Sequence, residues 1–236
     1  MSKSAAAWKV AKINLKNIRV PCLITAICAA VNLVQTSVKA LIASDGGDMS
    51  GQLEISGGCL LWLLPLLAAI FIPAKNFRRI INLGGKRASF LRGALMTYAV
   101  LAAAVSAGNM AVHYAFDLPM AATGYFEGVV NLVDVFGWTE HGVIAAFVQQ
   151  AAFLFLLAVF THTLTAAQGK WYGLAADILI IAVVSVFTPI DSLRAVLAGF
   201  FRLILFAGPL PQTAACLLIA AALWALNKPV LARTNI

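Results

Sequence analysis

The clearest absence in this 236-residue chain is charge, since Asp, Glu, Lys and Arg make up only 11% of its residues. Soluble domains carry roughly 25% charged residues, so a soluble globular fold does not fit. Hydrophobic residues fill the gap at 62%, and the mean hydropathy is +0.92. Apolar runs of about 18 residues or more, the length needed to cross a bilayer core, recur along the chain. The sequence therefore predicts an all-α, polytopic membrane protein, with one transmembrane domain over 1–236 and no soluble domain.

Signatures of catalysis and metal binding are also missing from the sequence. It contains no HExxH, no GxSxG and no phosphate-binding GxxxxGK[ST], because the Gly-Gly-Lys-Arg run at 84–87 lacks the required spacing. The cysteines stand apart in apolar segments without CxxC spacing, which favours a packing role; they are Cys22, Cys28, Cys59 and Cys216. We therefore expect neither an enzyme nor a chain that holds its own cofactor or metal.

Six apolar segments are predicted to span the membrane. They cover 21–42, 58–73, 88–112, 142–166, 171–188 and 211–226. An amphipathic helix is predicted before them at 5–19, with Trp8, Ala11, Leu15 and Ile18 on one face and basic residues on the other. This pattern is typical of a helix that lies at the headgroup level of a membrane.

The charges that are present divide cleanly between the two sides of the predicted spans. The N-terminal segment, the loop 74–92, the turn 167–171 and the C-terminal tail hold 14 of the 17 basic residues and none of the nine acidic ones. The other side holds all of the acidic residues except Asp177. The positive-inside rule then predicts that both termini are cytoplasmic. It also explains the net charge of +8 without a nucleic-acid partner.

The predicted outer loop at 113–141 is 29 residues long and carries acidic but no basic residues. Within it, the spacing of Phe126, Val129, Val130 and Val133 predicts a short helix that rests on the membrane surface.

The segment 191–209 does not fit a plain loop, because it is apolar yet carries Arg194 and Arg202. A full crossing here would place the C-terminus outside and break the charge pattern. We therefore expect a re-entrant helical hairpin buried against protein, with a surface-lying amphipathic helix as the alternative.

Polar residues inside the predicted spans are candidates for a transport pathway or for hydrogen bonds between helices. Asn32 and Gln35 in the first span belong to this group, and the pattern alone favours hydrogen bonding. Asp177 is the one acidic residue inside a span, which makes it a functional candidate by default. It has no second ionisable partner in a span, so a structural role is favoured, as is a packing or hydrogen-bonding role for His162.

The most informative stretch is the loop 74–92, AKNFRRIINLGGKRASFLR, with six basic residues and no acidic one. Phe77, Ile80 and Ile81 recur at helical spacing, so its first half is predicted to be an amphipathic helix. Gly84 follows as a stop signal. A plain connector does not need an apolar stripe, so the loop is predicted to dock against a cytoplasmic partner. An interfacial helix that binds anionic lipid is the alternative.

This order of elements, together with NFRRIINLGGKRASFLRGAL at 76–95, resembles the membrane subunit of type-2, export-type ABC transporters over essentially the whole chain. The local pattern is similar to that of small permeases from Gram-positive bacteria that export, or confer resistance to, peptides. The chain lacks the large extracellular domain of bigger relatives, and its short outer loop fits this small group better.

The resemblance implies a role for each part of the chain. The loop would be the coupling helix seated in a cleft of a separate ATPase subunit, which would hold the ATP and Mg. The contacting residues would be Phe77, Arg78, Arg79, Ile80 and Ile81, with Lys86 and Arg87 at the start of the third span. The segment 5–19 would be an elbow helix, and 191–209 the re-entrant pair before the last span.

The functional hypothesis is therefore the permease of an ABC exporter in a bacterial plasma membrane, paired with a second copy or paralogue. Amphipathic or antimicrobial peptides are the favoured cargo, and lipid-like molecules come second. The alternative is a non-transporting membrane sensor or assembly protein that uses its basic loop to bind a cytoplasmic partner or anionic lipid.

Overall fold

The computed structural model describes residues 3–47, 51–168 and 170–232. Its long elements are all helices, which confirms the predicted all-α membrane fold. Within the described residues, five helices are long and apolar enough to cross a membrane, or six if one bent pair counts as a single span. Asp48 and Arg233, which the charge pattern includes, lie outside the described residues.

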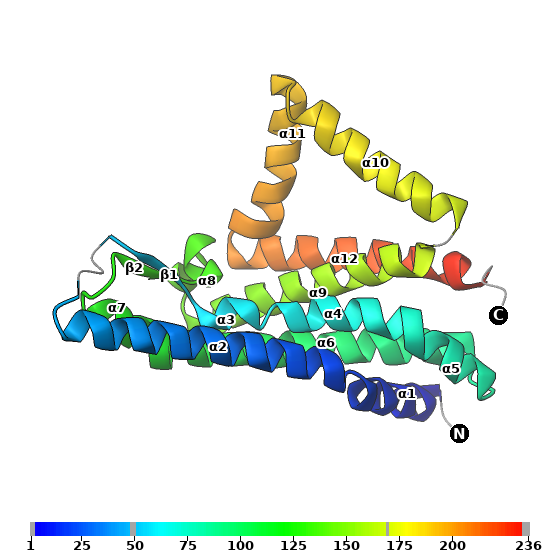
Figure 1. The fold of residues 1–236 in the computed structure, drawn as a ribbon. Helices are drawn as coiled ribbons and strands as arrows, with labels where there is room; N and C mark the ends of the chain where they lie inside the picture. Colours follow the sequence, from blue (N-terminus) through cyan, green and yellow to red (C-terminus); the bar gives the residue numbers. More distant parts are fainter. Residues whose placement is uncertain (1–2, 48–50, 169, 233–236) are drawn as a thin grey trace.

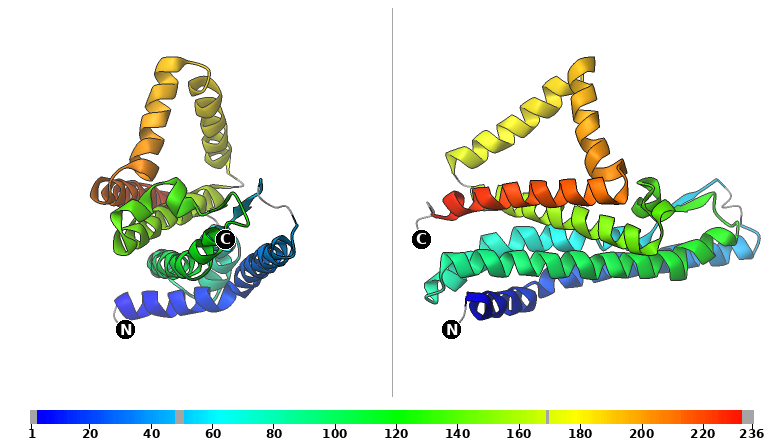
Figure 2. Two further views of the ribbon diagram at one scale, coloured as in Figure 1. Left: turned by 90° about the vertical axis from the view of Figure 1, so that its left-hand side faces the viewer. Right: turned by 180° about the vertical axis from the view of Figure 1, so that it is seen from behind.

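The N-terminal helix α1, Lys3–Asn17, runs at an angle to the bundle helices at one end of the molecule (Figure 2). Of the predicted apolar face, Ala11 and Ile18 are buried and Leu15 is half-buried, but Trp8 is 43% exposed. Ala7 and Asn14, beside that face, are also buried. The reason is protein contact. A Cβ on Gly93 would lie 2.5 Å from Val10 Cγ1 and 2.9 Å from the Ala7 carbonyl oxygen, so α1 presses its small residues against a glycine.

The first spanning helix is α2, Arg19–Ser44. The second span is one composite helix over Gly57–Asn82, longer than the predicted 58–73. It consists of α3 Gly57–Leu60, α4 Leu63–Phe71, the π-helical turn η1 Ile72–Asn76 and α5 Phe77–Asn82. Pro73 does not end it, because the wider π turn accommodates the proline and its missing donor.

The third span also exceeds its prediction of 88–112, since helical structure continues over Arg87–Ala122. It contains α6 Arg87–Val112, the π turn η2 His113–Asp117 and α7 Leu118–Ala122. The half of this long helix nearer its C-terminus carries polar residues of the candidate site described below.

The segment predicted as a surface helix around 126–133 is instead a short strand followed by a helical turn. Strand β2, Gly128–Val130, pairs in parallel with β1, Leu53–Ile55, and Glu54 lies opposite Val129. The helix prediction was wrong here because the β-branched valines satisfy their backbone groups across strands. Helix α8, Leu132–Val135, and the 3₁₀ turn η3, Trp138–His141, complete this part.

The core of the bundle is built around α9, Val143–Ala167, which packs against α4, α6 and α12. The last helix, α12, covers Pro209–Ala232. Figure 1 shows that α1, α5 and the C-terminal end of α12 lie at one end of the bundle, and β1, β2, α7 and α8 at the other. We call these the basic end and the acidic end after the charges that they carry.

Helices α10, Trp171–Phe187, and α11, Asp191–Phe201, form an arch that stands away from the bundle (Figure 1). The two are bent by 119°, and α11 continues into the π turn η4, Arg202–Phe206, before α12 begins. We call α10, α11 and η4 the arm. The prediction that 191–209 is buried against protein is wrong for α11, none of whose residues is buried.

Candidate functional site

The basic end carries the predicted coupling loop, and its local structure follows the sequence pattern closely. Helix α5 ends at Asn82, and Gly84 adopts φ +80°, a left-handed conformation that favours glycine. The Gly85 amide donates to the Ile80 carbonyl at 2.9 Å, and a Cβ on Gly85 would lie 2.6 Å from Ile80 Cγ2. The chain therefore reverses tightly between α5 and α6.

The apolar stripe of α5 faces the bundle rather than a partner. Phe77 is 3% exposed and Ile80 is 6% exposed. The Phe77 ring packs edge-on against Phe90 of α6 with centroids 5.1 Å apart, and Ile81 packs on the same cluster while half-buried. Of the predicted contact residues, Phe77 and Ile80 are therefore buried within the chain, where they stabilise α5 on the bundle.

The exposed part of the loop is instead its basic side and its tip. Arg78, Arg79 and Lys86 are exposed, and Leu83 is 79% exposed between them. Arg87 is half-buried at the start of α6. We call Arg78, Arg79, Leu83 and Lys86 the basic tip. Leu83 was not among the predicted site residues, although its place beside the stop signal at Gly84 marked it as a turn residue.

Hydrogen bonds between asparagine side chains join α1 to η1 at the basic end. Asn76 of η1 donates from Nδ2 to Asn14 Oδ1 of α1 at 3.1 Å, and its Oδ1 accepts from Asn17 Nδ2 at 3.3 Å. Asn14 is fully buried and Asn76 is 4% exposed. Because buried amides need partners, this bridge fixes α1 against the helix that carries the tip. Periodicity alone did not single out these three residues.

The predicted pathway residues do not form one site. Asn32 is half-buried on α2 beside Gly57, and Gln35 is exposed. Asp177 lies on α10, across the bundle from α2 (Figure 1), and accepts a hydrogen bond from Gln168 Nε2 at 2.9 Å. That bond ties α10 to the end of α9, which agrees with the favoured structural role for this carboxylate.

His162 likewise packs within the bundle. Its Nδ1 is 2.6 Å from the hydroxyl of Tyr98 on α6, and both side chains are fully buried. Its ring also lies 5.1 Å from that of Trp224 on α12. The favoured packing and hydrogen-bonding role therefore fits its surroundings, which join α6, α9 and α12.

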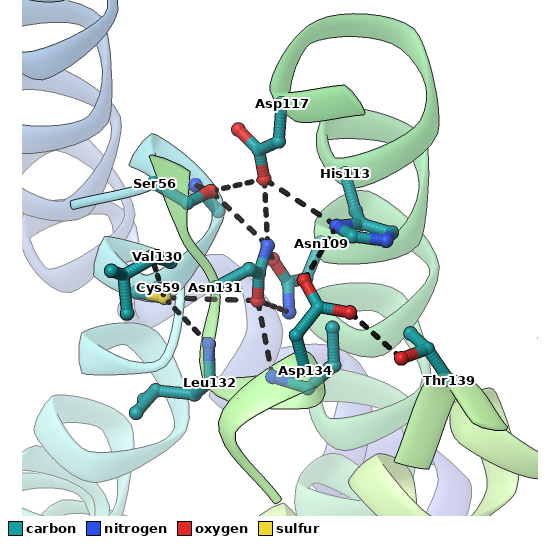
Figure 3. Close-up of polar contacts among 12 residues, drawn as sticks. Ser56, Cys59, Asn109, His113, Asp117, Val130, Asn131, Leu132, Asp134 and Thr139 are labelled. Carbon is teal, nitrogen blue, oxygen red and sulfur yellow. Dashed lines mark hydrogen bonds and ion pairs between the residues drawn. The ribbon is translucent and has the colours of Figure 1, made fainter. Parts of the chain in front are cut away.

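The acidic end holds a buried polar network that the sequence did not reveal (Figure 3). Asn109 of α6 and Asn131 exchange two hydrogen bonds of 3.0 and 3.2 Å. Asn131 also donates to Asp117 Oδ2 at 2.8 Å, and the Ser56 hydroxyl donates to the same oxygen at 2.6 Å. None of these residues is more than 2% exposed. The network therefore joins the start of α3, the η2 turn and α8 through side chains alone.

His113 lies beside this network (Figure 3). Its Nδ1 lies 3.4 Å from Asp134 Oδ2 and 3.8 Å from Asp117 Oδ2. Buried carboxylates are costly without partners, so the Ser56 hydroxyl and the Asn131 amide offset part of the burial of Asp117. Among the described residues, no group of three or more His, Cys, Asp or Glu side chains is placed to hold a metal ion. The arrangement is suited to holding α3, α6, η2 and α8 in fixed positions.

One local signal could have identified Asn131 as a helix cap. Asn131 is the N-cap of α8, where its side-chain oxygen accepts from the Val133 amide at 3.3 Å. An asparagine before a short apolar run, with Asp134 three residues later, is a recognised helix-start pattern. Its contacts with Asn109 and Asp117 could not be predicted, because they join segments distant in sequence.

The root of the arm is fixed by side chains that donate to the free carbonyls at the end of η4. Trp138 Nε1 donates to the Leu205 carbonyl at 2.7 Å, Gln149 Nε2 to that of Ala207 at 3.3 Å, and Gln212 Nε2 to that of Ile204 at 3.1 Å. A helix end leaves such carbonyls unsatisfied, and in a membrane they need protein partners. The arm is therefore anchored at η4.

Comparison of the chain with protein-family models, with curated proteins and with solved structures found no match.

Proposed function

We propose that this chain is the permease subunit of an ATP-driven exporter of the ABC type, which receives mechanical work from a separate cytoplasmic ATPase subunit. The observation that carries the proposal is the basic tip. Its exposed side chains lie on the short helix α5 and on the turn after it, and the apolar side of α5 is fixed to the bundle. A partner can push on such an element without unfolding it.

The connections of α5 suit the transmission of force. It continues directly from α4 through η1, and its Phe77 packs on Phe90 at the start of α6. The Asn14–Asn76 hydrogen bond adds α1 to the same unit. Displacement of the tip would therefore move the second and third spans together with the N-terminal helix, because packed elements move as rigid bodies.

The proposal includes the orientation and the partners that the sequence pattern favours. The proposal puts the basic end in the cytoplasm of a bacterial cell, and the positive-inside rule supports the cytoplasmic side. ATP and Mg are held by the partner, a second permease completes the pathway, and an amphipathic peptide is the favoured cargo. The contact with the ATPase is made by Arg78, Arg79, Leu83 and Lys86 rather than by the buried Phe77 and Ile80.

The decisive experiment is purification in mild detergent with identification of the co-purifying chains. Charge reversal at Arg78 and Arg79, combined with Leu83→Asp, is expected to reduce recovery of an ATPase about tenfold or more. The matched control is Arg92→Glu, which reverses an exposed charge at the same end but outside the tip.

Retention of the ATPase by the tip variant would contradict the coupling assignment. If instead no ATPase co-purifies with the wild type, and the tip variant only loses binding to anionic vesicles, the non-transporting alternative is supported.

A further inference from the structure

An apolar groove lies between the arm and the bundle. It is lined by Leu156 and Phe160 of α9, Phe200 and Ile204 of the arm, and Ile219 and Leu223 of α12, among other apolar residues. Its volume is about 260 Å³. Apolar cavities of about 150 Å³ stay dry and accept small hydrocarbons. Water is therefore a poor occupant of this groove, and a hydrocarbon chain is a good one.

The depth of the groove fits a lipid chain. Ile219 and Leu223 lie about three and four turns into α12, so roughly 15 and 21 Å from its first residue, Pro209. The hydrocarbon region of one leaflet is about 15 Å thick. A chain that enters near the start of α12 would therefore reach Ile219 near the middle of the bilayer.

The charge beside the groove identifies the kind of lipid. Three of the 17 basic residues lie outside the basic segments, namely Lys39, Arg194 and Arg202. Lys39 pairs with Glu54, and Arg194 pairs with Asp191. Among the described residues, Arg202 has no acidic partner, and its side chain is exposed. An exposed, unpaired arginine is a binding group for phosphate.

Arg202 lies near the start of α12. It directly follows Phe201, which also lines the groove, and the nearby Ile204 carbonyl is bonded to Gln212 in the first turns of α12. A long arginine side chain can extend from this depth to the lipid phosphate.

We propose that the groove under the arm binds one anionic phospholipid of the leaflet at the acidic end, with an acyl chain between α9, α11 and α12 and the phosphate on Arg202. The lipid fills the space that the arm leaves against the bundle and holds the arm at its observed angle. This proposal does not depend on the exporter assignment.

The test uses the full chain in nanodiscs with phosphatidylglycerol that carries a photoactivatable group at the end of one acyl chain. Labelling is expected in peptides that contain Leu156–Phe160, Phe200–Ile204 or Ile219–Leu223. Unlabelled phosphatidylglycerol should compete better than phosphatidylcholine. Arg202→Gln is expected to reduce that preference roughly fivefold, whereas Arg194→Gln, which removes the arginine already paired with Asp191, should leave it unchanged.

Filling the groove gives an independent measurement. Leu157 is half-buried in its lining, so Leu157→Trp should abolish the labelling, while Leu174→Trp on the exposed face of α10 should not. Thermal unfolding of each variant confirms that it is folded.

Four results would overturn the proposal. One is labelling that is spread evenly over the lipid-facing helices and is unaffected by Leu157→Trp. A second is an unchanged lipid preference in Arg202→Gln. A third is that the groove is labelled by a photoactivatable amphipathic peptide but not by the lipid. The fourth is that Leu157→Trp converts a dimer into a monomer in native mass spectra. These last observations would assign the groove to cargo or to a second copy.

Discussion

At the scale of single residues, Asn131 is the side chain on which the acidic end depends most. Its Nδ2 donates hydrogen bonds to Asn109 and Asp117, and its Oδ1 accepts from the Val133 amide at the start of α8. All three partners are buried, so removal of this one side chain leaves donors and acceptors without water to replace it.

We therefore expect Asn131→Ala to lower the free energy of unfolding by about 2 to 4 kcal/mol, measured by thermal or denaturant unfolding in detergent. Asn82→Ala is the matched control, since it removes the same side chain at an exposed position and should change stability by less than about 0.5 kcal/mol. Equal effects of the two substitutions would show that the network does not contribute to stability.

At the scale of elements, the contact between α1 and α6 depends on the absence of a side chain at Gly93. A Cβ at this position would lie only 2.5 Å from Val10 Cγ1 and 2.9 Å from the Ala7 oxygen, so there is no room for one. The same contact explains why Trp8, which was predicted to share the apolar face of α1, is exposed: α6 packs against the small residues of this helix instead.

Gly93→Val is expected to displace α1 from the bundle at a cost of about 1 to 3 kcal/mol. Amide hydrogen exchange over Lys3–Asn17 should accelerate, while exchange in α9 should not. Gly199→Val provides the comparison, because a Cβ at this α11 position meets no atom within 4 Å. Unchanged protection of α1 in the Gly93 variant would mean that the close contact does not hold this helix.

At the scale of the whole molecule, the basic segments gather at one end of the bundle although they are far apart in the chain (Figure 1). Helices α1 and α5 and the end of α12 lie there, whereas β1, β2 and α8 lie at the opposite end. This separation is what an even number of crossings requires, provided that α10 and α11 act together as one span.

The orientation can be measured with single cysteines in a chain whose four native cysteines have been replaced. A membrane-impermeant maleimide should label Ala121→Cys at the acidic end in intact cells. It should label Asn82→Cys at the basic end only after permeabilisation. Both positions are exposed, so accessibility within the protein is matched. The reverse pattern would refute the cytoplasmic placement of the basic end.

Much of the fold was determined by the sequence alone. Apolar length set the number of spans, basic residues marked one end, and the glycine at 84 ended α5 where predicted. These features are local, since each depends on residues within a few turns of one another. The positions of helix ends inside proline-containing segments were less predictable: the second span continued past Pro73 because a π turn accommodated it.

Tertiary structure decided which surfaces are free. The sequence showed that α5 has an apolar side and a basic side, but only its packing on Phe90 showed that the apolar side is occupied and the basic tip is exposed. The network around Asn131 and the groove beneath the arm likewise join residues far apart in the chain. Contacts of this kind are selected by the packing of whole helices, and no local pattern encodes them.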